Sequence, residues 1–157
     1  MVRQLQPWHE NLGKRQVKAP KVYVRDSGLL HALLGLTTER EILSHPKVGA
    51  SWEGFAIEEV LKVARPDAAY FWATHTGAEL DLLLIRRGRR YGVEVKFQDA
   101  PRITPSMRIA LSDLRLQHLS VLYPGDHRYS LERRITVVPL AELAAGAQVV
   151  MPATRGR

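Results

Sequence analysis

The sequence contains no cysteine, and this absence excludes disulfide bonds, thiol catalysis and thiolate metal sites. It also has no apolar run long enough to span a membrane and no secretory signal, so we expect a cytoplasmic protein without membrane contact. No G-x4-G-K-[ST] motif is present, which excludes P-loop nucleotide hydrolysis by this chain. Aromatic residues are few, at 7%, and the tryptophans are scattered, so the sequence gives little support for stacking on single-stranded nucleic acid.

What is present is the composition of a folded, basic domain. The chain has 157 residues, of which 45% are hydrophobic and 25% charged, and this suits one domain with a substantial core. The net charge of +7 favours a polyanionic partner such as nucleic acid. We expect residues 1–20 to be a remnant or linker of a longer chain, residues 21–146 to be a single α/β domain, and residues 147–157 to be a disordered basic tail.

The strongest local pattern is a β-hairpin at residues 78–98. The segment VEVKF at 93–97 alternates apolar and charged residues, as a half-buried strand does. Arg87 and Gly88 suit a two-residue turn, in which Gly88 supplies the positive φ that such turns favour. This turn pairs Arg86 with Arg89 and fixes the register of the whole hairpin.

In that register, two carboxylates lie across the strand pair. Asp81 falls opposite Glu94, and Lys96 projects from the same face. Like charges at directly opposite positions repel, so either one carboxyl is protonated or a cation lies between them. One interpretation is a Mg2+ site for phosphodiester cleavage in which Lys96 steadies a water or the developing charge. The other is a solvated face, with Lys96 paired to Glu79 and Asp81 pointing into water.

A helix over residues 50–65, ended by Pro66, carries a third acidic candidate. Glu53 shares a face with apolar residues near the helix start. It is either a first-turn acid favoured by the helix dipole or a third carboxylate aimed at the Asp81 site. Glu58, Glu59 and Lys62 lie on the polar side, and we expect them to form a solvated face in which Glu58 pairs with Lys62.

The remaining pattern predicts an α-β-β-β-α-β order. Further strands are expected at 21–24, 68–73, 118–123 and 135–139, and further helices at 29–34, 104–114 and 140–145. Asp26 and Ser27 cap the helix at 29–34, which is apolar on most sides and therefore expected to be buried. The hairpin is antiparallel and the crossover through helix 104–114 is parallel, so the fold class is α/β, with a mixed sheet flanked by helices.

Basic residues beside the hairpin are candidates for phosphate contact. Arg86, Arg87, Arg89 and Arg90 surround the hairpin turn, and His75 lies in the loop that leads into the first hairpin strand. These side chains either grip a nucleic-acid backbone or are the ordinary exposed residues of a turn and a loop.

Four segments carry a family resemblance: KxPKVYxRDSGLLHALLG, HPKVGASWEGFAIEEVL, THTGAELDLLL and VEVK. Together, over about residues 12–143, they resemble the C-terminal domain of unknown function that follows the ATPase module of many bacterial and archaeal AAA-type ATPases. The order of Glu53, Asp81, Glu94 and Lys96 also resembles the PD-(D/E)XK nuclease-like superfamily. The resemblance implies a restriction-endonuclease-like core of α-β-β-β-α-β order.

The resemblance also implies roles. Asp81 and Glu94 would bind Mg2+ or Mn2+ with the backbone carbonyl of Val95, Glu53 would help to hold the metal, and Lys96 would support the attacking water. DNA would be the substrate, and the ATPase module would lie upstream, outside this chain. The fold does not fix the chemistry, so a non-catalytic recognition or oligomerisation module built on a nuclease-like scaffold is the alternative. We also expect a homodimer, because a domain separated from its neighbour commonly exposes apolar surface.

Overall fold

The computed structural model describes residues 1–10, 13 and 16–153, and its centre is a six-stranded sheet. The strands are β3 (Ala68–Ala73), β4 (Glu79–Arg86), β5 (Arg89–Val95), β6 (His118–Tyr123), β7 (Tyr129–Glu132) and β8 (Ile135–Pro139), in the order β3-β4-β5-β6-β8-β7. The β3–β4, β4–β5 and β7–β8 pairs are antiparallel, whereas β5–β6 and β6–β8 are parallel. The mixed α/β architecture predicted from the sequence is therefore confirmed.

Helices cover the two faces of this sheet. On one face, α3 (Val48–Ala64) and the short 3-10 helices η1 (Leu140–Ala145) and η2 (Ala147–Val149) pack against Leu82, Leu84 and Val93. On the other, α4 (Pro105–Asp113) packs against Leu83 and Leu119. Thr104 caps α4 by accepting a hydrogen bond from the N–H of Met107, and Pro105 occupies the first turn, where it needs no donor. Each face thus has its own apolar core.

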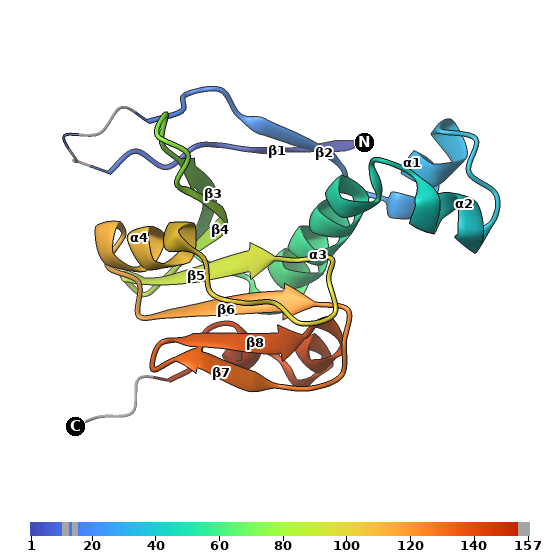
Figure 1. The fold of residues 1–157 in the computed structure, drawn as a ribbon. Helices are drawn as coiled ribbons and strands as arrows, with labels where there is room; N and C mark the ends of the chain where they lie inside the picture. Colours follow the sequence, from blue (N-terminus) through green and yellow to red (C-terminus); the bar gives the residue numbers. More distant parts are fainter. Residues whose placement is uncertain (11–12, 14–15, 154–157) are drawn as a thin grey trace.

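The N-terminal segment forms a second, two-stranded sheet. Strand β1 (Val2–Leu5) pairs antiparallel with β2 (Lys21–Val24), and Figure 1 shows this ribbon running across the β3–β4 side of the molecule. Backbone hydrogen bonds link it to β3, from the N–H of Trp8 to the carbonyl of Phe71 at 2.7 Å and from the N–H of Phe71 to the carbonyl of Gln6 at 3.1 Å. The expected linker at 1–20 is therefore in part a packed element, although residues 11–12 and 14–15 lie outside the described part.

Helices α1 (Ser27–Leu33) and α2 (Glu39–Ser44) project away from the sheet beside the start of α3 (Figure 1). Asp26 caps α1 as predicted, since its carboxylate accepts from the N–H of Leu29 at 2.9 Å. The expected burial of α1 is wrong: none of its residues is buried, and Leu33 is 72% exposed. Its apolar faces have too few neighbouring elements to cover them.

Three further differences concern element ends and pairs. Strands β1 and β7 and helix α2 were not expected from the sequence. The expected disordered tail begins as η2, and Val149, Val150 and Met151 are buried in the core on the α3 face, while residues 154–157 lie outside the described part. Glu58 is not part of a solvated face, because it is 9% exposed and forms ion pairs with Arg3 and Arg25. Lys62 pairs with Glu59 instead. Among the described residues, no helix has the length and apolar character needed to cross a membrane.

Candidate functional site

The site begins where β4 leaves its regular pairing with its neighbours. The β4–β5 register is the predicted one from Arg86–Arg89 to Leu82–Val93, and the turn between the strands has φ of 49° at Arg87 and 70° at Gly88. Beyond Leu82 the pairing of β4 with β3 shifts: Tyr70 opposes Leu83, but Trp72 opposes Leu80. Asp81 and Leu82 of β4 thus lie opposite one residue of β3, Phe71, so β4 carries one extra residue here. Bulges of this kind re-aim side chains and are common beside functional sites.

Asp81 is re-aimed toward the backbone of the next strand. Its Oδ2 accepts a hydrogen bond from the N–H of Val95 at 2.9 Å, and the residue is 7% exposed. The interpretation in which Asp81 points into water is therefore wrong. Burial, together with the negative charges of Glu94 and Glu53, raises the pKa of the Asp81 carboxyl well above its ordinary value.

Glu94 is the second buried carboxylate and is only half paired. Its Oε1 accepts a hydrogen bond from the Lys96 ammonium at 2.6 Å. Its Oε2 is buried without a hydrogen-bond partner among the described residues, which is costly for a charged oxygen. Burial raises the pKa of Glu94, although the positive charge of Lys96 acts in the opposite direction. The chain therefore places two buried carboxyl groups together with a lysine that directly follows β5 and neutralises one of them.

A second lysine, which the sequence analysis did not single out, approaches from the N-terminal ribbon. The ammonium of Lys21 lies 3.2 Å from Glu53 Oε1 and 3.7 Å from Asp81 Oδ1, and it is also paired with Glu79. Burial acts to lower the pKa of Lys21, but the bond to Glu79 and the charges of Glu53 and Asp81 outweigh it and raise that pKa. The alternative interpretation paired Lys96 with Glu79, but in the described part of the chain Glu79 pairs with Lys21 and Lys96 with Glu94.

Glu53 lies at this same cluster rather than at an isolated helix end. It is positioned by α3, and its Oε1 accepts a hydrogen bond from the hydroxyl of Tyr23 at 2.6 Å. Lys21 and Tyr23 alternate with Val22 on β2, so both project from one side of the ribbon onto one carboxylate oxygen. The expectation of a third carboxylate near Asp81 thus agrees with the geometry.

The oxygen donors suit a hard divalent cation in type, since carboxylates and backbone carbonyls are its usual protein ligands. Glu94 Oε2, which no described residue hydrogen-bonds, and the crowding of Asp81 with Glu94 are what a site built for a cation would have. In the described part of the chain, however, no three acidic or histidine side chains are already arranged as a metal ligand set. The cation that the Glu53, Glu79 and Asp81 carboxylates share in this structure is the Lys21 ammonium.

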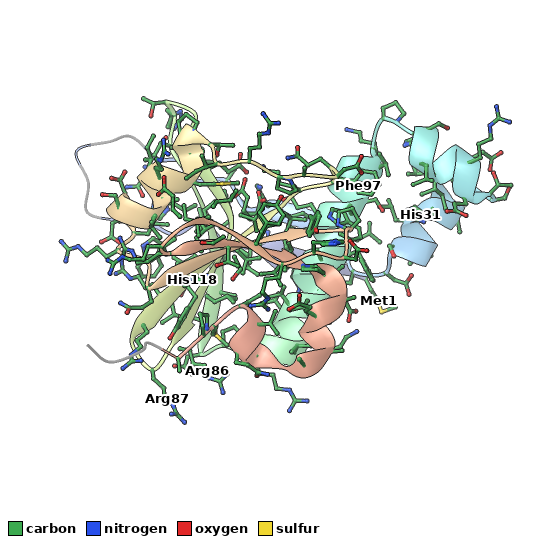
Figure 2. All side chains as sticks on the ribbon, turned by 60° about the horizontal axis from the view of Figure 1, so that its bottom comes forward. Met1, His31, Arg86, Arg87, Phe97 and His118 are labelled. Carbon is green, nitrogen blue, oxygen red and sulfur yellow. The ribbon has the colours of Figure 1, made fainter. Side chains whose placement is uncertain are left out.

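The predicted phosphate-contacting residues divide between two ends of the hairpin. Arg86 and Arg87 lie at the turn, far from Phe97 at the exit of β5 (Figure 2). Asp81 is five residues from Arg86 along β4, or about 17 Å. His75 is exposed in the β3–β4 turn, at the end that carries Glu79 and Asp81. The fold therefore brings His75 to the acidic end and separates the turn arginines from it.

Arg86 and Arg90 are held by contacts with residues outside the hairpin turn. Arg86 donates to the carbonyl of Ala64 at 3.0 Å. Arg90 pairs with Glu10 and lies 5.0 Å above the Trp8 ring. Arg87 is exposed, and its backbone N–H donates to Asp67 at 2.6 Å. Arg89 is exposed as well.

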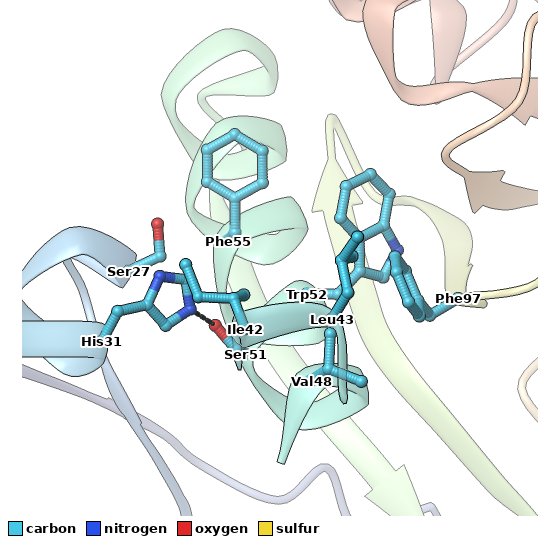
Figure 3. Close-up of a pocket in the computed structure, with 9 residues that line it drawn as sticks. All are labelled: Ser27, His31, Ile42, Leu43, Val48, Ser51, Trp52, Phe55 and Phe97. Atoms are coloured by element: carbon cyan, nitrogen blue, oxygen red, sulfur yellow. Dashed lines mark hydrogen bonds between the residues drawn. The ribbon is translucent and has the colours of Figure 1, made fainter. Parts of the chain in front are cut away.

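A mostly apolar pocket of about 280 Å³ lies beside the acidic cluster, between α1, α2 and the first turns of α3. Figure 3 shows its lining, in which Trp52 and Phe97 approach with ring centroids 5.7 Å apart. Its polar contact joins two helices, because His31 Nε2 and Ser51 Oγ are 2.8 Å apart. Since Trp52 precedes Glu53 and Phe97 follows Lys96, the pocket adjoins the acidic cluster along both elements.

Comparisons with known proteins give the relationship of the chain. The proteins Mb2031c of Mycobacterium bovis and Rv2008c of Mycobacterium tuberculosis, both described as uncharacterized, are each 46% identical to it over 149 residues. The alignment covers 95% of this chain and 34% of each relative, so the chain spans about a third of their length. No solved structure matches it.

Two family models match separate parts of the sequence. Residues 1–40 match a domain of unknown function, DUF8612, which covers the ribbon and α1. Residues 48–143 match another, also described as a domain of unknown function, and this stretch contains Glu53, Asp81, Glu94 and Lys96. Because that second match covers more than half of the sequence, the chain belongs to the DUF4143 family.

Proposed function

We propose that this domain is a nuclease-like module of PD-(D/E)XK type that binds a divalent cation, Mg2+ or Mn2+, and acts on phosphodiester bonds of DNA. The observation that carries the proposal is the buried pair of Asp81 and Glu94 beside Lys96, in which one Glu94 oxygen has no hydrogen-bond partner among the described residues. Burying two like charges is costly, and such arrangements concentrate at functional sites. The resemblance to domains that follow AAA-type ATPase modules supports an ATPase as the natural partner.

Asp81 and Glu94 would hold the cation with the carbonyl of Val95, and Glu53 would complete the ligand set. A bound divalent cation supplies positive charge to a phosphoryl oxygen and lowers the pKa of a bound water. The N–H of Val95 fixes the Asp81 carboxylate on the β5 side, so its second oxygen is free of that bond. The ligand positions would thus be set by β4, β5 and α3, which are parts of the rigid core.

Lys96 would supply a positive charge beside the proposed cation. Burial acts to lower its pKa, but Glu94 raises it, so the side chain carries its positive charge at neutral pH. Its ammonium donates to Glu94 and is 31% exposed, which leaves donors for a water or a phosphate oxygen. Positioned positive charge of this kind stabilises charge that develops in the transition state.

The test combines metal binding with cleavage. Mn2+ is titrated calorimetrically into the wild type, Asp81→Asn and a control, Glu132→Gln, whose carboxylate pairs with Arg108 far along the chain. Plasmid and single-stranded DNA are then incubated with the wild type and Lys96→Met. We expect Mn2+ binding that Asp81→Asn abolishes and Glu132→Gln retains, with cleavage lost in Lys96→Met. Absence of Mn2+ binding by every variant at millimolar concentration would overturn the proposal.

A non-catalytic recognition or oligomerisation module is the second candidate, and a specific observation favours it. Several large apolar side chains are exposed on α1–α3 and at the β5 exit, as on surfaces that bind other proteins. They are Leu29, Leu33, Leu34, Leu43, Phe55 and Phe97, which we call the helical apolar surface. Metal binding by the wild type separates the two candidates, because a recognition module has no need of it.

A further inference from the structure

One ammonium group contacts three carboxylates of the candidate site. Lys21 lies on β2, outside the six-stranded sheet. Its ammonium group contacts Glu53 on α3 and both Glu79 and Asp81 on β4. Its side chain is 26% exposed and also lies 5.5 Å from the Phe71 ring centroid. A lysine held on several sides in this way is a fixed part of the site rather than a mobile surface charge.

We propose that Lys21 is the built-in cation of this site and competes with a divalent cation for the same carboxylates. The inference rests on the proposed function, since it concerns the occupancy of the proposed metal site. In this arrangement the Lys21 ammonium group balances part of the negative charge of the site when no metal ion is bound. Lys21 would have to withdraw from these carboxylates for a divalent cation to bind them.

The geometry makes the two occupants exclusive. A divalent cation takes carboxylate oxygens at about 2.0–2.6 Å. An ion bound to Glu53 Oε1 and Asp81 Oδ1 would lie within a few ångströms of the Lys21 nitrogen, which is already 3.2 Å and 3.7 Å from those oxygens. Two cations at that separation in a poorly hydrated site repel strongly. The carboxylates therefore serve one of them at a time.

The ribbon holds Glu53 through a second group. Tyr23 donates to the same Glu53 oxygen that Lys21 contacts, so two donors from β2 must give up that oxygen before a metal ion takes it. The ribbon is itself tied to α3 through Arg3 and Arg25, which both bind Glu58. Withdrawal of Lys21 is thus coupled to the position of the β1–β2 ribbon, and a ligand that moves the ribbon would open the site.

The experiment measures Mn2+ affinity of the full chain by calorimetry in the wild type and Lys21→Met, which removes the charge but keeps the apolar stem. Lys21→Arg keeps the charge, and Lys62→Met is the matched control, because Lys62 pairs with Glu59 on the exposed side of α3. We expect Lys21→Met to bind Mn2+ at least tenfold more tightly than the wild type. Lys21→Arg and Lys62→Met are expected to stay within about twofold of it, and Lys21→Met combined with Asp81→Asn is expected to lose binding.

The outcomes separate this inference from the function on which it rests. Equal affinities of the wild type and Lys21→Met would overturn the competition and leave the metal site standing. Absence of binding in both would overturn the metal site and the inference with it. Thermal melts verify that each variant is folded, and Lys21→Gln, which removes the charge but retains a hydrogen-bond donor to the carboxylates, provides the same measurement if Lys21→Met does not fold.

Discussion

The carboxylate of Asp81 accepts a hydrogen bond from the backbone N–H of Val95, 2.9 Å away on the neighbouring strand. The negative charge of Glu94 also acts on this carboxylate and helps to raise its pKa, after the larger effect of burial. One contact stabilises the native hairpin and the other opposes it. Functional sites commonly keep such opposed interactions at a cost in stability.

Asp81→Asn separates these two contributions. The amide oxygen still accepts from Val95. Burial and the charges of Glu94 and Glu53 raise the pKa of the Asp81 carboxyl to about 8, so this group must take up a proton on folding at pH 7, and the amide has no such cost. The free energy of unfolding should therefore rise by about 1 kcal/mol. Urea unfolding at pH 7 measures it, with Glu132→Gln as the exposed control. A loss of stability larger than that of the control would show that the charge of Asp81, through Lys21, supports the fold.

Glu58 predicts the pH dependence of the ribbon. Burial alone would raise its pKa, but the hydrogen bonds and charges of Arg3 and Arg25 outweigh burial and lower it. A carboxyl whose pKa is depressed on folding contributes stability above its ordinary pKa of about 4.3, and this contribution is lost as the pH falls below that value. Stability that depends on Glu58 is therefore present at neutral pH and lost in acid.

The substitution Glu58→Gln tests this dependence. At pH 7 we expect a loss of about 2 kcal/mol in the free energy of unfolding, because two arginines lose a charged acceptor. Near pH 3 the difference from the wild type should shrink, because the unfolded chain takes up a proton at Glu58 that the native state resists, and the stabilisation by the ionised carboxylate falls. Urea unfolding at the two pH values checks it, with Glu59→Gln as control, because Glu59 is half-buried and pairs only with the exposed Lys62 among the ion pairs of the described residues. A difference that is equal at both pH values would contradict the assignment.

The helical apolar surface predicts self-association. Leu33 is 72% exposed and Leu43 52% exposed, on two helices that project from the sheet. Replacing both with glutamate should weaken a dimer by tenfold or more, because charge is excluded from the centre of protein interfaces. Sedimentation velocity over a concentration series measures the dissociation constant. Val2→Glu, at a 62% exposed site on β1, is the control, and a wild type that stays monomeric at high concentration would overturn the prediction.

The sequence was sufficient for elements whose pattern is local. The 87–88 turn fixed the register of the hairpin down to Leu82 and Val93, because a two-residue loop permits few pairings. Thr104 and Pro105 likewise signalled the start of α4. The shift in β4 pairing beyond Leu82 was not predictable from the hairpin alone, because it depends on how β3 meets the other edge of the strand.

Long-range contacts were the part that the sequence did not reveal. Lys21 and Tyr23 alternate on a short strand, which predicts a shared side but not the carboxylates that they meet. Glu58 has the helical spacing of a pair with Lys62, but in the fold its carboxylate forms ion pairs with Arg3 and Arg25 of the N-terminal segment. The prediction that α1 is buried was wrong for a related reason. Its leucines indicate apolar faces, but they do not show which other elements lie close enough to cover those faces.

The hairpin turn gives a prediction for nucleic-acid binding that is independent of the acidic site. Arg87 is exposed at the turn, about 20 Å along the strand from Asp81. If DNA lies along the hairpin, Arg87→Ala should weaken its binding severalfold and reduce the slope of log affinity against log salt by about one. Mn2+ affinity should stay unchanged, because the arginine is remote from the carboxylates. Fluorescence anisotropy with a labelled duplex between low and physiological salt measures the slope, and Arg108→Ala, whose side chain pairs with Glu132, is the control. An unchanged slope in Arg87→Ala would remove the hairpin turn from the DNA-binding surface and leave the acidic end as the place to look for contact.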